Sequence, residues 1–192
     1  MKKCTFLLVI LGLMLMGCSE EKDVPQLVPY ELSTDEKQMV HLAATPTEDL
    51  LVYKVKPGNV VVDVKVEHYQ KGKLVNSFME FSQEIGEGES FLSFGSREIT
   101  LEEKPFRQWF LSVNGGHITT VKGPIADQGA YSSTSLREAR ELSSDQYVAV
   151  GVWIQAGEKK NLSPLVLDEK EALEKIIQDH EEVYVLLCKL KV

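Results

Sequence analysis

Val60-Val61-Val62-Asp63-Val64-Lys65-Val66-Glu67-His68 is the stretch that decides the fold of this chain. Valines at every second position give the segment one apolar face, while Asp63, Lys65 and Glu67 form the other face. Strict alternation of this kind indicates a strand with one face buried and one in water. Gln70-Lys71-Gly72-Lys73 follows as a hairpin signal, because its glycine can adopt positive φ. The segment therefore predicts an antiparallel sheet.

The same alternation recurs along the rest of the chain. Turn signals such as Pro57-Gly58-Asn59 and Asn114-Gly115-Gly116 separate the alternating segments. We expect strands at residues 51–56, 60–68, 74–81, 90–94, 108–113, 117–121, 147–155 and 183–192. Such a series of strands, mostly joined by hairpins, favours an antiparallel β-sandwich, Ig-like or jelly-roll-like, or an open barrel.

Two short helices are expected among the strands. Ser135-Leu136-Arg137-Glu138 has the spacing of a capping box, and Leu136, Ala139 and Leu142 would share one face of that helix. Asp168 begins the second helix, whose apolar stripe is Ala172, Leu173, Ile176 and Ile177. Both stripes predict packing against the sheets.

The N-terminus carries a different signal. Lys2 and Lys3 precede an almost wholly apolar run over residues 6–16, too short to span a membrane as a helix. Leu15-Met16-Gly17-Cys18 closes the run, and this stretch resembles the lipobox of bacterial lipoproteins. The resemblance covers the first 18 residues and implies cleavage between Gly17 and Cys18.

The same resemblance implies that Cys18 becomes the lipidated N-terminus. It would carry a thioether-linked diacylglycerol with fatty acyl chains such as palmitate, and two chains hold a protein stably on a bilayer. Membrane lipid would then be the first partner, and the location would be the extracytoplasmic face of the cell membrane. An uncleaved anchor helix and an ordinary secretory signal are the alternatives.

These signals divide the chain into three parts. Residues 1–17 are expected to be the signal peptide, 18–47 the lipidated cysteine with a flexible tether, and 48–192 a single domain. Charge together with Pro25, Pro29 and Pro46 argues against regular packing in the tether, although residues 32–42 could form a short helix or remain extended.

Composition limits the functions available to the mature protein. The net charge is −8, and loss of Lys2 and Lys3 would lower it to about −10, which argues against nucleic acid as a partner. Of the three cysteines, Cys4 would be removed and Cys18 acylated, so only Cys188 would remain and no disulfide could form within the chain. Cys188 lies in a strongly apolar segment and is expected to be a buried side chain.

No catalytic motif appears in the sequence. The four histidines, His41, His68, His117 and His180, are far apart and have no metal-ligand spacing, so neither a metal nor another cofactor is expected. A hydrolase would need a site assembled from distant residues such as His117 and Asp127. We therefore expect a protein that is not an enzyme.

Aromatic residues gather in the middle and late strands, and most are needed as core. If Trp109 or Phe106 faces outward, it could form a binding surface, with His117 near a loop surface. The sequence thus favours a binding or structural module for a protein or envelope component. The alternative is a small-molecule or glycan-binding lipoprotein accessory to a transporter, for which a pocket lined by Trp109 and His68 would be the sign.

Overall fold

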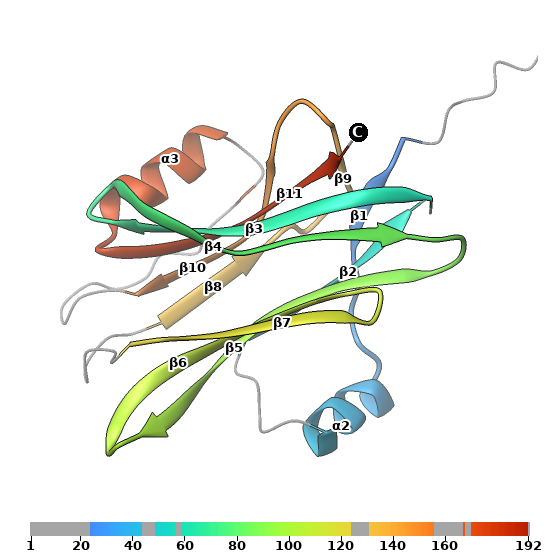
Figure 1. Cartoon of the computed structure of the whole chain (residues 1–192). Coiled ribbons are helices and arrows are strands. Elements are labelled where there is room, and N and C mark those ends of the chain that lie inside the picture. The colour runs from blue at the N-terminus through green and yellow to red at the C-terminus, as the bar shows by residue number, and fades with distance from the viewer. Residues whose placement is uncertain are drawn as a thin grey trace, which may run out of the picture.

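The computed structural model describes residues 24–43, 49–56, 59–123, 131–155, 167 and 170–191. These residues form two antiparallel sheets packed face to face as a β-sandwich (Figure 1). The residues of the predicted signal peptide and lipidation site, Gly17 and Cys18 included, lie outside the described residues. None of the described helices is long and apolar enough to cross a membrane.

The first sheet has six strands. In spatial order they are β7 (Gly116–Lys122), β6 (Lys104–Val113), β5 (Ser90–Leu101), β2 (Asp49–Lys56), β1 (Gln26–Pro29) and β9 (Arg140–Glu141). The second sheet has five strands. In spatial order they are β4 (Lys73–Ile85), β3 (Val60–Gln70), β11 (Glu182–Lys191), β10 (Val148–Gln155) and β8 (Tyr131–Ser135).

The core lies between the sheets and follows the predicted alternation. Val62, Val64 and Val66 of β3 are at most 1% exposed, and the decisive stretch buries the face that its valines define. Both sheets contribute rings to the centre, where Trp109 of β6 meets Trp153 of β10 with ring centroids 5.8 Å apart. All eight expected strands are present, most of them longer than the pattern indicated.

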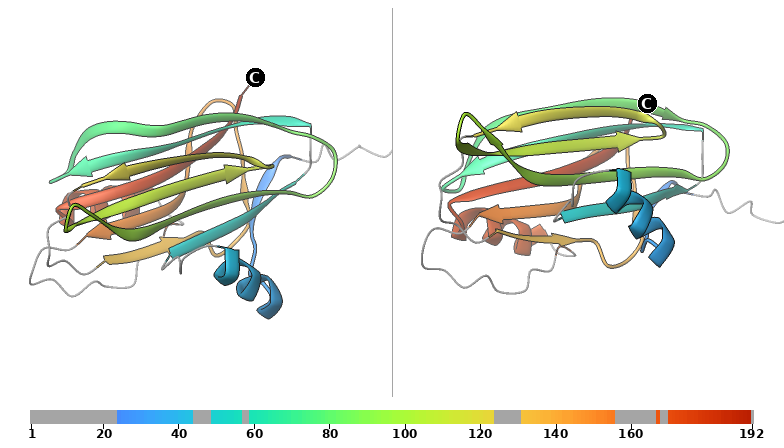
Figure 2. Two further views of the ribbon diagram at one scale, coloured as in Figure 1. Left: turned by 60° about the horizontal axis from the view of Figure 1, so that its bottom comes forward. Right: turned by 90° about the horizontal axis from the view of Figure 1, so that it is seen from below.

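The helices lie outside the two sheets. α3 (Lys170–Asp179) covers the outer face of the second sheet beside β11, so Val183 and Val185 are buried although they point away from the core (Figure 1). This helix confirms the prediction made from the stripe of Leu173, Ile176 and Ile177. α2 (Thr34–Ala43) lies on the outer side of the first sheet (Figure 2).

The prediction of a helix near Ser135 is wrong. Ser135 ends β8 in the second sheet, and Arg140–Glu141 already belongs to β9 in the first sheet, so the segment crosses between sheets as extended chain. Leu136 and Leu142 are buried as the stripe required, but their amides donate to the carbonyls of Val150 and Pro25. Bonds to two different sheets replace those of a helix, and tertiary packing therefore overrides the local spacing.

The expected tether is also corrected by the structure. β1 pairs with both β2 and β9, and Leu27 at its centre is fully buried. Pro25 precedes this short strand and Pro29 is its last residue, and a proline at a strand end removes few ladder bonds. The sandwich therefore includes Gln26–Pro29, which the predicted boundary at residue 48 had left in the tether.

Strand register defines the two ends of the sandwich. β1 begins opposite the last residue of β2, at the same end as the β4–β5 and β6–β7 turns. We call this the entry end. The β3–β4 and β5–β6 hairpins and the start of β8 lie at the opposite end, which we call the far end and which is on the left in Figure 1.

Candidate functional site: a polar cluster at the far end

Inward-facing polar side chains gather at the far end of the sandwich. Six of them, which we call the far-end cluster, come from both sheets: His68, Arg107, Lys122, Tyr131, Gln155 and Glu182. Their strands place them there because each lies near the far-end terminus of its strand. The interior at this end is therefore polar where an ordinary sandwich core is apolar.

The contacts of the cluster run from one sheet to the other. The Arg107 guanidinium of β6 lies over the Tyr131 ring of β8, with its central carbon 3.7 Å from the ring centroid. Tyr131 Oη donates to Gln155 Oε1 at 2.7 Å, and Gln155 is the cross-strand partner of Glu182. Glu182 therefore lies on the same inward face of the second sheet as Tyr131 and Gln155.

A second line of contacts starts from Glu182. One carboxylate oxygen is a hydrogen-bond partner of His68 Nε2, and the other accepts a bond of 2.8 Å from Gln70 Nε2. The His68 ring stacks on Tyr184 with centroids 4.6 Å apart, and Tyr184 in turn contacts the Trp109 ring at 4.8 Å. Trp109 lies two residues beyond Arg107 on the same face, and the line of contacts therefore returns to β6.

Of the six side chains in the cluster, only Arg107 has a buried polar atom without a hydrogen-bond partner among the described residues. It is 2% exposed, and its Nη1 donates to Ser96 Oγ at 2.9 Å. Its Nε is buried and has no acceptor, and among the described residues no carboxylate forms an ion pair with it. A buried cation without a counter-ion is costly and is uncommon in a core.

Burial controls the ionisation of the cluster's phenols. It raises the pKa of Tyr131, while the nearby positive charge of Arg107 acts in the opposite direction. Burial also raises the pKa of Tyr184 well above its usual range. Both phenols are therefore neutral hydrogen-bonding groups at neutral pH.

The predicted binding surface of Phe106, Trp109 and His117 is not assembled. Trp109 is fully buried, so the prediction that it forms part of an exposed surface is wrong. Alternation places Phe106 on the opposite, outer face of β6, where it is half-buried. His117 is exposed on that outer face too, but it pairs with Ser112, six residues or about 20 Å along the strand from Phe106.

The remaining candidate residues lie elsewhere. Asp127, the hypothetical partner of His117 in a hydrolase, lies outside the described residues. Cys188 is fully buried, as expected, and burial raises the pKa of its thiol far above the usual range. Among the described residues, no three His, Cys, Asp or Glu side chains converge as a metal site.

One sequence signal would have led to the far-end cluster. Arg107 occupies an inward position in the alternating series that continues through Trp109, Leu111 and Val113, each fully buried. A charge on an apolar face breaks the pattern of a strand, and such breaks are expected at functional sites. Glu182, Tyr131 and Gln155 gave no comparable signal. Strand pairing brings these three together, and only the packing of the two sheets places Tyr131 against Arg107.

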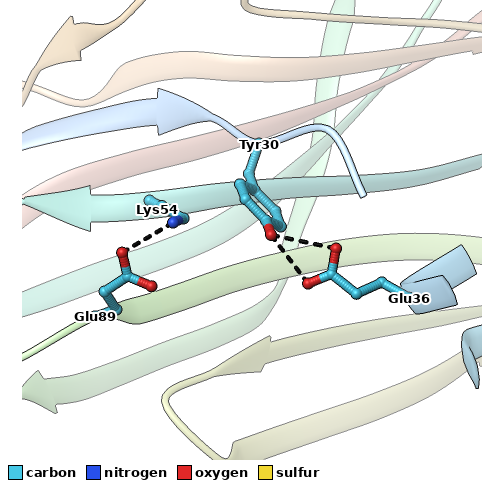
Figure 3. Close-up of polar contacts among 4 residues, drawn as sticks. All are labelled: Tyr30, Glu36, Lys54 and Glu89. Atoms are coloured by element: carbon cyan, nitrogen blue, oxygen red, sulfur yellow. Dashed lines mark hydrogen bonds and ion pairs between the residues drawn. The ribbon is translucent and has the colours of Figure 1, made fainter. Parts of the chain in front are cut away.

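A second polar cluster fastens the N-terminal segment to the first sheet. Tyr30 Oη donates to Glu36 Oε1 of α2 at 2.9 Å, and Lys54 Nζ pairs with Glu89 Oε1 at 2.9 Å (Figure 3). Lys54 also lies over the rings of Tyr30 and Phe91, at 4.6 Å and 5.4 Å. These contacts tie α2, β1, β2 and β5 together, which is a structural role.

A capping box starts α2. Ser33 Oγ accepts from the Glu36 amide, and Glu36 Oε2 accepts from the Ser33 amide at 2.8 Å. These bonds, with the one from Tyr30, lower the pKa of Glu36. The Ser-x-x-Glu spacing at residues 33–36 thus marks a real helix start, whereas the same spacing at residues 135–138 does not.

The fold and the far-end cluster define a small antiparallel β-sandwich with an interior polar site at one end. A family model described as the YgaN domain matches residues 26–190. The chain belongs to this family, and the match begins at the first residue of β1. No curated protein and no solved structure matches the chain.

Proposed function

We propose that this protein is a lipid-anchored, extracytoplasmic lipoprotein whose sandwich is a binding or structural module for a protein or another envelope component. The single observation that carries the proposal is the position of β1. The first described strand begins at Gln26, eight residues after the cysteine that ends the lipobox-like stretch. Eight extended residues span at most about 28 Å.

A short connection of this length would hold the entry end close to the bilayer. The hydrogen bond from Tyr30 to Glu36 also holds the segment that follows β1 against the sandwich. The far end would then point away from the membrane and present its hairpins and polar cluster to a partner. The proposal assigns no catalytic step to the protein.

Lipidation is tested by replacing the cysteines one at a time. Cys18→Ala should block incorporation of labelled palmitate and leave the unprocessed precursor. Cys4→Ala is the matched control, since Cys4 lies in the segment to be removed, and it should be labelled as the wild type is. A Cys18→Ala protein that is still matured and acylated would refute the anchor.

Orientation and partner are tested by photo-cross-linking in intact cells. A photoreactive residue at Glu103, on the far-end hairpin, should give a reproducible protein adduct. The same residue at Glu87, in the entry-end turn, should give none, although both positions are exposed. Adducts from Glu87 alone would contradict the proposed orientation.

A second candidate function is supported by two ring contacts of Tyr184. The structure brings His68 and Trp109 to the same region through Tyr184, which touches both rings. That arrangement favours a small-molecule or glycan-binding lipoprotein accessory to a transporter. Cross-linking without protein adducts at either end would favour this alternative.

A further inference from the structure

Three buried hydrogen-bond donors on neighbouring interior side chains have no acceptor among the described residues. Arg107 Nε, Trp109 Nε1 and Trp153 Nε1 are all buried, and none has an acceptor among the described residues. Trp109 follows Arg107 on the same face of β6, and its ring lies 5.8 Å from that of Trp153. All three groups donate and none can accept, so the missing partner is an acceptor.

A second cation lies beside Arg107. Lys122 of β7 is its direct cross-strand partner, and Lys122 Nζ lies 4.6 Å from the centroid of the Phe78 ring. Like charges directly opposite each other on neighbouring strands destabilise a sheet. An anion near both cations would remove that repulsion.

Among the described residues, the two carboxylates nearest in register to Arg107 and His68 do not fill the role. Glu182 is engaged by His68 and Gln70. Glu98 pairs with Arg107 across β5 and β6, but its side chain is exposed and forms no ion pair with Arg107. Nε of the guanidinium thus has no acceptor, while Nη1 is held by Ser96.

We propose that the far-end cluster binds a carboxylate group, with Arg107 as the residue that donates to it. Ser96 and the Tyr131 ring hold the guanidinium plane, and a planar fork fixed in this way matches the two oxygens of a carboxylate. Lys122 adds a positive charge beside the site. The inference rests on the proposed binding function, for which it names the chemistry, but it does not depend on lipidation at Cys18.

The test follows the tryptophan side chains of the full-length chain in detergent micelles. The chain has two tryptophans, so a protein labelled with ¹⁵N in the indole gives two Nε1–H signals, and Trp109→Phe identifies one of them. Sodium acetate should shift the Trp109 signal saturably, and sodium chloride at equal ionic strength should not. The absence of a saturable acetate shift would overturn the proposal.

Variants then assign the effect to Arg107. Arg107→Met should abolish the acetate shift without lowering the melting temperature, because an apolar side chain of similar length suits a buried position. Arg97→Met is the matched control, since Arg97 lies on the outer face of the same sheet, where its Nε donates to Gln108. An acetate shift that survives Arg107→Met, or one that Arg97→Met also abolishes, would overturn the assignment.

If Arg107→Met fails to fold, Arg107→Lys serves in its place. Lysine keeps the charge without the planar fork, so the acetate concentration at half-saturation should rise at least about tenfold. An unchanged half-saturation point would exclude recognition by the fork. Cys18→Ala should leave the acetate response intact, which separates failure of this proposal from failure of the proposed anchor.

Discussion

The two ends of the sandwich are closed by different kinds of side chain. At the entry end the interior is apolar, and Val62, Ile85, Leu92 and Val113 are fully buried between the sheets. At the far end the same layer contains Arg107, whose charge is buried without an ion-pair partner among the described residues. The entry end is thus built as hydrophobic packing normally requires, and the far end departs from it.

The hairpins repeat this contrast. Asn114-Gly115 at the entry end adopts positive φ at both residues, which suits asparagine and glycine. Glu102 and Glu103 at the far end adopt the same kind of turn, with φ of 51° and 62°. Positive φ is strained for glutamate, so at the far end the β5–β6 hairpin turn is destabilising, as is the buried charge in the interior.

The largest effect is expected where β1 joins the entry end. Leu27→Ala should lower the free energy of unfolding by about 2–5 kcal/mol, because it empties a fully buried position. Val28→Ala on the half-buried outer face is the control and should cost less. Urea unfolding measures both. If Leu27→Ala lowered the free energy of unfolding by less than about 1 kcal/mol, β1 would be a loosely held tether and not part of the core.

The next effect tests how tightly the middle of the core is packed. A Cβ at Gly151 would lie 2.7 Å from Leu51 Cδ1 and 2.9 Å from the Trp153 ring. Gly151→Ala should therefore cost about 1–3 kcal/mol by overpacking. Gly86→Ala, where a Cβ meets nothing within 4 Å, should be close to neutral in the same urea experiment. Equal effects of the two substitutions would show that close contacts of the added Cβ do not cause the loss of stability at Gly151.

Alkaline pH should destabilise both halves of the core. Burial raises the pKa of Tyr53, whose hydroxyl donates to the Val150 carbonyl, and that of Tyr184, from the ordinary value of 10.0. A raised pKa in the folded state stabilises the fold fully below pH 10, and this stability is lost as pH rises further. Each of these tyrosines should lower the free energy of unfolding by about 1.4 kcal/mol at pH 11, relative to its value well below pH 10.

Urea midpoints at pH 8, 10 and 11 measure this loss. Tyr184→Phe should make the fall above pH 10 shallower, because one of the buried phenols is gone. A midpoint that stays constant to pH 11 would contradict the assignment to buried tyrosines.

The smallest effect concerns the far-end hairpin. Glu103→Gly should stabilise the protein by roughly 1 kcal/mol, since glycine adopts positive φ without strain. The reciprocal change Gly115→Glu at the entry-end hairpin should destabilise it by a similar amount, because a Cβ there meets nothing within 4 Å and only the backbone is strained. A Glu103→Gly variant no more stable than the wild type would show that the far-end hairpin is not strained, and the two ends would then not differ in this respect.

Much of the fold could be predicted because side-chain direction follows the backbone locally. The valines of β3 and the stripe of α3 needed no knowledge of their partners. β1 was missed, because a strand of four residues that ends in a proline carries no periodic signal, and its bonds to β2 and β9 come from distant segments. The helix expected at residues 135–142 failed for the same reason, since its leucines are buried against two different sheets.

The candidate site was less predictable than the fold. The sequence offered Phe106, Trp109 and His117 as a surface, but alternation alone puts Phe106 and Trp109 on opposite faces of one strand. The local pattern was thus enough to show that these residues do not form one surface. It could not predict that Tyr131 approaches Arg107, or that Glu182 meets His68 across 114 residues of sequence.

By itself, the sequence determined the positions of eight strands and one helix, the burial of Cys188 and the apolar faces that form the core. Only the tertiary structure decided where the domain begins and which polar side chains meet at the far end. The physical reason is that periodicity records which way a side chain points, because that depends on neighbouring residues alone. Strand order and register depend on the packing of whole faces against each other, and they bring together residues that no local pattern connects.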